Sequence, residues 1–156
     1  MALTLLGAGS FPAGTIVQTV SQAITAQTDI SSTSYTATGL TQAITPKFSD
    51  SKILVLVSLS ADFYQNGNAS RSLSLQILRD TTQIAVRTDN CYAGTASNSY
   101  YSTPTHGTMN FLDSPNTTSS ITYSVKGNVS ATGNTTVFRV GNNNGTSTLT
   151  LQEIAQ

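Results

Sequence analysis

A single cysteine and a single histidine are the residues best suited to covalent chemistry in this 156-residue chain. Cys91 and His106 share a polar segment, and a thiol beside an imidazole can form a nucleophile–base pair. No third residue that would orient the base and no recognised motif accompanies them. A lone cysteine is more often an inert, small apolar side chain. One residue of each type also excludes an internal disulfide, an all-cysteine metal site and any site with two imidazoles.

The acidic residues are the other candidates for catalysis. They are Asp29, Asp50, Asp62, Asp80, Asp89, Asp113 and Glu153. Acid–base catalysis needs two carboxyl groups in different environments, and calcium needs clustered oxygen ligands such as D-x-D-x-D. Most of these acids instead adjoin predicted turns, where aspartate bends the backbone. We therefore expect no enzyme activity, no metal and no cofactor.

Tyrosines offer a different chemistry, the recognition of sugars. Tyr92, Tyr100 and Tyr101 lie in the same segment as His106, and the chain has six tyrosines but no tryptophan. Their rings can stack on sugar faces, or they can pack between subunits and cover an open end of the fold. Both interpretations stay open, so these four residues form a candidate contact set for a glycan or a neighbouring subunit.

Charge and composition exclude several classes of partner. Seven basic residues balance seven acidic ones, only 9% of residues are charged, and serine and threonine make up 47 of the 156 residues. No basic excess is available to hold a phosphate backbone, and no apolar run is long enough to span a membrane. We expect a neutral, hydroxyl-rich β protein that binds neither nucleic acid nor membrane.

The first residues are expected to form a short arm. Residues 1–14 carry Leu3, Leu5 and Leu6 but lack the positive start and the long apolar run of a signal peptide. An apolar arm ahead of a domain is typical of an attachment element, although a terminus can also fray or pack locally. The expected organisation is an arm over 1–14 and one domain over 15–156.

Strand patterns fill most of that domain, because β-branched residues dominate and helix formers rarely cluster. The strongest strand is expected over 51–63, where Leu54 and Leu56 on the second face indicate a central or covered strand. Alternation over 71–88 predicts a hairpin. The residues expected to face inward are Ile53, Val55, Val57, Leu59, Ala61, Phe63, Leu73, Leu75, Ile77, Ile121, Tyr123 and Val125.

Weaker patterns complete the set of strands. Further strands are expected over 15–25, 34–38, 42–46, 108–112, 120–126, 135–140 and 147–154. The last two are expected to form a hairpin around 141–145, because Asn-Gly accepts positive φ angles. Residues 90–107 are expected to be the longest irregular segment. Eight to ten short strands with regularly spaced turns predict an antiparallel sandwich or barrel.

Several motifs along the chain carry a family resemblance. They are GLTQAITP (39–46) followed by SKILVLV (51–57), LDSPNTT (112–118) leading into ITYSV (121–125), STLTLQEIA (147–155), and PAGTIV (12–17). Together they resemble small β-sandwich virion proteins of tailed phages, especially those of aquatic bacteria (cyanophage-like). The resemblance covers most of 12–156, and its motifs are structural. It implies an all-β, antiparallel, jelly-roll-like sandwich with a short N-terminal arm, found as trimers in tail fibres and in head decoration (cement) proteins.

Of these two roles, the resemblance together with the chain's length favours decoration, because a tail fibre needs a shaft for which this chain has no room. The expected function is a non-enzymatic protein of the outer capsid surface that binds the major capsid protein as a homotrimer and stabilises the head. Leu3, Leu5, Leu6 and Phe11 are the expected capsid anchors, aided by sheet-edge or loop contacts. The alternatives are a fibre or spike module that recognises host glycans through Tyr92–Tyr101, and a small polysaccharide hydrolase or lyase.

Overall fold

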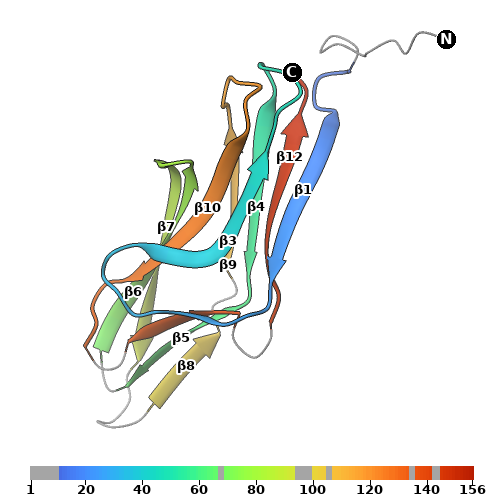
Figure 1. Ribbon diagram of the computed structural model, residues 1–156. Coiled ribbons are helices and arrows are strands. Elements are labelled where there is room, and N and C mark those ends of the chain that lie inside the picture. The colour runs from blue at the N-terminus through green and yellow to red at the C-terminus, as the bar shows by residue number, and fades with distance from the viewer. Residues whose placement is uncertain (1–10, 67–68, 94–99, 105–106, 134–135, 142–144) are drawn as a thin grey trace, which may run out of the picture.

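Alternating apolar residues fold this chain into strands throughout the computed structural model, which describes residues 11–66, 69–93, 100–104, 107–133, 136–141 and 145–156 (Figure 1). The strands are β1 (Ile16–Ile24), β2 (Thr28–Ile30), β3 (Thr36–Ile44), β4 (Lys52–Leu59), β5 (Ala61–Asn66), β6 (Ala69–Arg79), β7 (Thr82–Ala93), β8 (Tyr100–Pro104), β9 (Gly107–Asp113), β10 (Ile121–Val129), β11 (Val137–Val140) and β12 (Ser147–Ile154). All strand pairs are antiparallel. The expected all-β, antiparallel class is confirmed.

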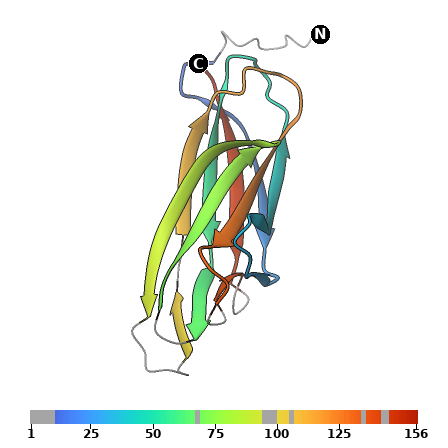
Figure 2. The same ribbon diagram turned by 90° about the vertical axis from the view of Figure 1, so that its left-hand side faces the viewer.

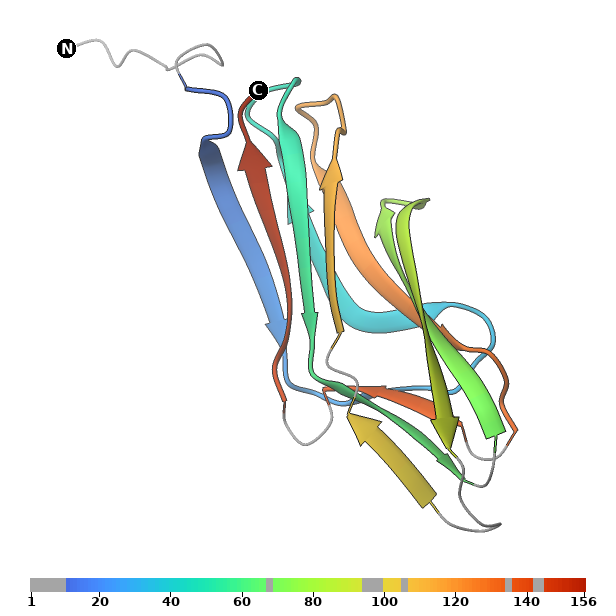
Figure 3. The same ribbon diagram turned by 180° about the vertical axis from the view of Figure 1, so that it is seen from behind.

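The strands form three four-stranded sheets. Their orders are β1-β12-β4-β9, β3-β10-β6-β7 and β2-β11-β5-β8. The first and third sheets have matching orders, because each strand of the first is next along the chain to its counterpart in the third. β1 and β4 run directly into β2 and β5, and β8 and β11 run directly into β9 and β12. The third sheet is therefore a bent extension of the first, and it crosses one end of the molecule (Figures 1 and 3).

Counting each continued strand once leaves eight passes of the chain in two layers. One layer contains passes one, eight, three and six, and the other contains passes two, seven, four and five. This interleaved order in two antiparallel layers is that of a jelly roll. The long β6–β7 hairpin runs along one side of the second layer (Figure 2). The expected jelly-roll-like sandwich is therefore present.

A continuous apolar core lies between the layers. Every residue that the sequence placed inward is buried, and Ile53, Phe63, Ile77 and Tyr123 are fully inaccessible. Leu149 and Leu151 add the corresponding positions of β12. Burying side chains of this size contributes about 1.5–3 kcal/mol each, so the core dominates the stability of the fold. Period-two alternation thus identified these core residues correctly, although others such as Ile30, Leu40 and Phe138 were not named from the sequence.

Two strand predictions were wrong in their boundaries. The segment 51–63 is not one strand: it divides at Ser60 into β4 and β5, and the chain passes there from one sheet into its bent extension. The backbone carbonyl of Ser60 accepts a hydrogen bond from Gly141 N–H at 2.7 Å, which holds the bend. Conversely, 34–38 and 42–46 are not two strands, because β3 continues through Gly39, whose φ is +92°.

Two predictions about connections were also wrong. Residues 90–107 are not the longest irregular segment, because β7 reaches Ala93 and β8 pairs with β5 along Tyr100–Pro104. Residues 135–140 and 147–154 do not form a hairpin: β11 pairs with β2 and β5, whereas β12 pairs with β1 and β4. The short strand β2 was missed. In each case pairing between strands that are distant in the sequence decided the outcome, and the residues of a local turn carry no information about that pairing.

Gly141 should be intolerant of any side chain. Its φ is +74°, and an added Cβ would lie 2.7 Å from the carbonyl oxygen of Ala26. Gly141→Ala is expected to cost roughly 2–4 kcal/mol, because it combines a strained backbone with overpacking. Gly133→Ala is the matched control: the nearest atom to its added Cβ is an Arg71 nitrogen at 3.6 Å. Chemical denaturation of both variants checks this, and equal stabilities would contradict it.

Candidate functional site

The structure describes only part of the predicted site residues. Leu3, Leu5, Leu6 and His106 lie outside the described residues. Cys91 and Tyr92 belong to β7, and Tyr100 and Tyr101 belong to β8, although only their backbone is described. Phe11 is described, and it lies three residues before Gly14, which is hydrogen-bonded to Ala155 near the C-terminus. Phe11 is therefore the predicted anchor from which the site can be built.

The chain enters the sandwich through a short, hydrogen-bonded turn. Gly14 N–H donates to the carbonyl of Ala155 at 2.9 Å, and Ala155 N–H donates back to the carbonyl of Thr15 at 2.9 Å. Thr15 N–H also donates to the carbonyl of Pro12 at 3.1 Å. Gly14 has a φ of +87°, which glycine adopts without strain. These bonds attach the root of the arm to the C-terminal residues, so the arm leaves from a fixed point.

A buried carboxylate organises the same end. Glu153 on β12 is fully inaccessible to solvent. Its Oε1 accepts hydrogen bonds from the backbone N–H groups of Lys47 at 2.7 Å and Phe48 at 3.1 Å. Its Oε2 accepts one from Nε2 of Gln18 at 2.6 Å. A buried charge is tolerated only when it is well satisfied, and three donors satisfy this one. Glu153 thus holds the loop between β3 and β4 against β1.

That loop carries the aromatic partner of the arm. The rings of Phe11 and Phe48 lie 5.8 Å apart between centroids, tilted by 50°. This tilted geometry is favourable for aromatic pairs and is worth about 0.5–1.5 kcal/mol beyond area burial. Phe11 is half-buried here. Phe11 therefore packs on its own sandwich at the root of the arm.

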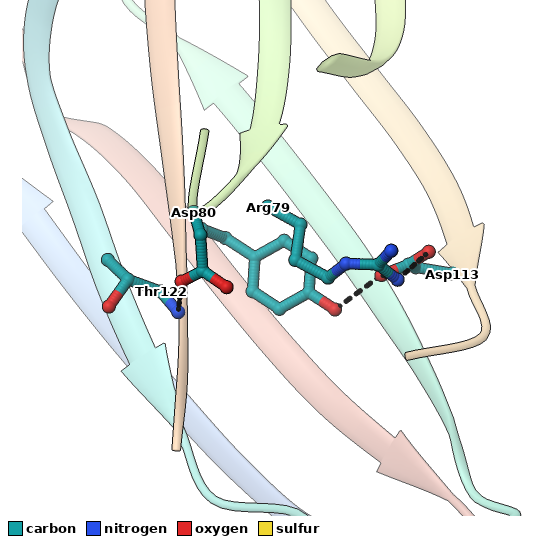
Figure 4. A network of polar contacts seen from close by, with 5 residues as sticks. Arg79, Asp80, Asp113 and Thr122 are labelled. Atoms are coloured by element: carbon teal, nitrogen blue, oxygen red, sulfur yellow. Dashed lines mark hydrogen bonds and ion pairs between the residues drawn. The ribbon is translucent and has the colours of Figure 1, made fainter. Parts of the chain in front are cut away.

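A second buried carboxylate braces the two layers near this end (Figure 4). Asp113, the last residue of β9, accepts hydrogen bonds from Arg79 Nη1 at 3.0 and 2.9 Å and from the Tyr123 hydroxyl at 2.7 Å. Arg79 and Tyr123 belong to the opposite layer. Nearby, the turn residue Asp80 exchanges two hydrogen bonds with the backbone of Thr122. The brace therefore joins β9 to β6 and β10 across the core.

The Tyr123 hydroxyl stays protonated in this setting. Burial raises the pKa of Tyr123 far above its ordinary value, and the hydrogen bond to Asp113 raises it further. A neutral phenol is the form that can donate to the Asp113 carboxylate. The network consequently has one anion, one cation and one neutral donor, which is a stable combination for a buried site.

A third carboxylate lies toward the opposite end, on the bent extension. Asp62 is 4% exposed and accepts hydrogen bonds from Arg139 Nε at 2.9 Å, from Arg139 Nη2 and from the Ser102 hydroxyl. The Arg139 guanidinium lies 4.6 Å above the Tyr64 ring. Hydrogen bonding to Asp62 raises the pKa of Arg139, so its charge is secure. The donors of Asp62 come from two neighbouring strands, which fastens β11 and β8 onto β5.

The two candidate contact regions lie at opposite ends of the molecule. The arm leaves beside the C-terminus, whereas β8 and the far end of β7 lie at the other end (Figures 1 and 3). The backbone register places Tyr100 opposite Asn66 and Tyr101 opposite Gln65. Tyr100 and Tyr101 therefore belong to a strand and not to a loop. This separation allows one end to attach while the other end is presented.

Side chains close both lateral edges of the sandwich. On one side, Gln22 Oε1 of β1 accepts a hydrogen bond from Thr41 N–H of the edge strand β3 at 2.6 Å, and Gln18 Nε2 of β1 donates to the carbonyl of Thr45, just after β3, at 2.8 Å. On the other side, Arg87 of β7 donates to the Thr108 carbonyl of β9 at 2.9 Å. Contacts with other molecules are therefore better made through the faces and the ends than through these edges.

The interpretation of most acids as turn residues was wrong for Asp113, and the burial of three acids was not expected from the sequence. Asp62, Asp113 and Glu153 are buried within or at the end of strands. Glu153 could have been found, because it shares the inward phase of β12 with Leu149 and Leu151. In the described part of the chain, no three His, Cys, Asp or Glu residues are grouped to hold a metal. That part also contains no helix long and apolar enough to cross a membrane.

Comparison with known proteins gives few matches. No family model and no curated protein sequence matches the chain. Among solved structures, it is similar to chains from infectious bursal disease virus of the Gt strain (13% identity, 90% of this chain, 33% of that chain, TM-score 0.36) and of the Gx strain (13% identity, 90% and 39%, TM-score 0.34). The chain spans less than half of either. Both TM-scores are low, so the fold description rests on the strand order itself.

Proposed function

We propose that this chain is a non-enzymatic virion protein that decorates the outer surface of a phage capsid. In this proposal it binds the major capsid protein as a homotrimer and stabilises the head. The observation that carries the proposal is the bonded root of the arm, where Gly14, Ala155 and the buried Glu153 fix the exit of an apolar N-terminal segment. The sequence resemblance to phage virion proteins supplies the identity of the partner.

The arm end supports attachment for a physical reason. An arm that leaves from a fixed point loses less conformational entropy on binding than a freely moving terminus. Phe11 already packs on Phe48, so the root of the arm is held in place up to this residue. Leu3, Leu5 and Leu6 would then supply the apolar area that drives docking. The arm is in this way the proposed capsid-binding element.

The buried carboxylates also support a structural role rather than catalysis. Asp62, Asp113 and Glu153 each have at least three hydrogen bonds to groups of their own fold. A general base must be able to reach a substrate proton. Asp113 and Glu153 are turned inward, Asp62 is buried beside Arg139 on the other face of β5, and all three are already satisfied, which fits braces of a rigid shell component.

Removal of the arm tests the proposal. A chain without residues 2–11 is expected to lose binding to phage particles while keeping the fold and the oligomeric state of the full chain. Labelled protein is incubated with particles and located by electron microscopy, and light scattering gives the oligomer. Val86→Ser is the control, because it removes a residue that is 52% exposed from another face of the sandwich. Undiminished binding of the shortened chain would contradict the attachment role.

A second function is favoured by one observation, the placement of Tyr100 and Tyr101 in β8 at the end away from the arm. A module attached by its arm would present this end outward. It would then act as a fibre or spike tip that recognises host surface glycans. Label at a tail or fibre tip, together with glycan binding lost in Tyr100→Ala, would favour this function over decoration. Label on the head shell would favour decoration.

A further inference from the structure

A row of charged side chains crosses the outer face of the β2-β11-β5-β8 sheet, at the end of the molecule away from the arm (Figures 1 and 3). In the strand register, Arg139 of β11 pairs with Asp29 of β2 on one side and with Asp62 of β5 on the other. We call these three residues the Arg139 row. Ile30 and Phe138, the neighbours of Asp29 and Arg139 along their strands, are buried in the core, so the row faces outward.

Charge is rare on the other outer faces. Only 9% of the residues of the chain are charged. On the outer faces of the other two sheets, the charged strand residues that the structure describes are Lys52 of β4 and Lys126 of β10, one on each sheet. The Arg139 row is therefore the place where a guanidinium and two carboxylates lie next to one another on an otherwise hydroxyl-rich surface.

Part of the Arg139 row is occupied by the brace on β5. Arg139 donates to Asp62 through Nε and Nη2, and the Ser102 hydroxyl donates to the same carboxylate. Asp62 therefore neutralises the charge of Arg139 and is already satisfied. The ion pair of Arg139 is made with Asp62 and not with Asp29.

Two polar atoms of the row remain available. Asp29 is exposed, and its Oδ1 accepts a hydrogen bond from Gln27 Nε2 at 2.7 Å. The side chain of Arg139 is 23% exposed. Among the residues that the structure describes, none forms a hydrogen bond with Asp29 Oδ2 or with Arg139 Nη1. One strand thus offers an acceptor and the next a donor, on side chains whose Cβ atoms lie about 5 Å apart.

The charges of the row favour an uncharged ligand. A carboxylate only accepts hydrogen bonds and a guanidinium only donates them, whereas a hydroxyl group does both. An anion would be repelled by Asp29 while the charge of Arg139 is already neutralised, and a cation would be repelled by Arg139. Neighbouring hydroxyls of a sugar can donate to Asp29 and accept from Arg139 without either repulsion.

Apolar groups flank these polar atoms on the same face. Val137, which is half-buried, pairs with Tyr64, and the exposed Pro104 pairs with Asp62. The guanidinium of Arg139 lies 4.6 Å above the Tyr64 ring, a cation–π contact that helps to hold it in place. The C–H groups of a sugar ring can bury apolar surface against such residues while the hydroxyls are bound.

We propose that the Arg139 row is a binding site for an uncharged glycan, which donates a hydroxyl hydrogen bond to Asp29 and accepts one from Arg139. This inference rests on the second function proposed above, glycan recognition at this end, and adds to it the residues and the class of glycan. Each copy should bind weakly, because the row offers few hydrogen bonds. Several copies on one particle would bind a glycan-covered surface together.

A glycan array tests the site with the full chain. The array carries uncharged, carboxylated and sulfated oligosaccharides, and bound protein is detected through an epitope tag. We expect the parent chain to bind uncharged oligosaccharides in preference to the charged ones. Asp29→Ala should lower this binding at least ten-fold, and it should leave the fold intact because Asp29 is exposed. Asp50→Ala is the matched control, since it removes an exposed acid from the loop between β3 and β4 and should not change binding.

Two further measurements locate the ligand and test the role of charge. The Arg139 Nε–H signal in an NMR spectrum should shift when the best uncharged oligosaccharide is added to the parent chain, and should not shift in Asp29→Ala. Asp29→Lys changes the row from one net negative charge to one net positive charge. This variant should therefore prefer sulfated over uncharged oligosaccharides.

Three outcomes on the array would overturn the inference: equal binding by Asp29→Ala and the parent chain, binding of charged oligosaccharides only, and no binding of any glycan. Equal binding by Asp29→Ala together with lost binding by Tyr100→Ala would keep glycan recognition at this end and move it to other residues. No glycan binding at all would overturn the second function as well. The position of labelled protein on phage particles would still decide the decoration role by itself.

Discussion

Glu153→Ala is expected to destabilise the protein by about 3 kcal/mol and to loosen the root of the arm. The substitution leaves the Lys47 and Phe48 N–H groups and the Gln18 amide without their acceptor, and each unsatisfied buried donor costs about 1–3 kcal/mol. The loop that carries Phe48 would no longer be held, and the Phe11–Phe48 contact would weaken with it. Urea denaturation measures the first effect, and amide hydrogen exchange of residues 11–15 measures the second.

The control for this prediction is the neighbouring residue of the same strand. Gln152 points to the outer face and is half-buried, so Gln152→Ala should change the free energy of unfolding by less than about 0.5 kcal/mol. Glu153→Gln separates shape from charge, because it keeps the volume but places an amide donor against a ring of donors. If Glu153→Gln were as stable as the parent chain, the satisfied charge would not be what holds this end together.

Asp113→Ala is expected to have a similarly large effect on stability, about 3 kcal/mol, because it leaves a half-buried cation and a buried hydroxyl unpaired. The loss should be cooperative, since the brace joins the two layers. A double-mutant cycle with Arg79→Ala isolates the pair, and the double variant should lose less than the sum of the single losses. Additive losses, measured by calorimetry, would show that the ion pair contributes little.

Tyr123 should make the protein sensitive to alkali. Its pKa is raised in the folded state and is about 10 in the unfolded chain. Stability is therefore fully present below about pH 10 and is lost as the pH rises further, because only the unfolded state can then release this proton. Tyr123→Phe should cost about 1 kcal/mol at neutral pH and flatten the decline above pH 10. An unchanged decline would assign it to other groups.

The faces of the strands were predictable from the sequence, and their partners were not. Alternation in SKILVLVSLSADF identifies which side chains are buried, because it depends only on neighbouring residues of one strand. The transfer of the chain between sheets at Ser60 depends instead on the Gly141 N–H, which comes from a distant part of the sequence. Asn-Gly at 144–145 favoured a hairpin locally, but the pairing of β12 with β1 and β4 overrode it.

The site was predictable to a smaller extent. Phe11 was identified as part of an anchor, but its partner Phe48 was not, because a long-range ring contact leaves no periodic pattern. The buried acids show the same division. Glu153 lies on the inward phase of its strand and could have been identified. Asp62 lies on the opposite phase from Phe63 and Ala61, and its burial depends on Arg139 and Ser102, which are both distant in the sequence.

The hydrogen bonds at the lateral edges of the sandwich affect its tendency to aggregate when many copies lie close together. Identical sandwiches packed side by side at high local concentration are at risk of joining strand to strand into open-ended sheets, since an unpaired edge is a template for another copy. Gln18, Gln22 and Arg87 use up edge groups on β3 and β9, and inward charges on β7 add to this protection. These contacts lower the risk that copies of the chain join edge to edge.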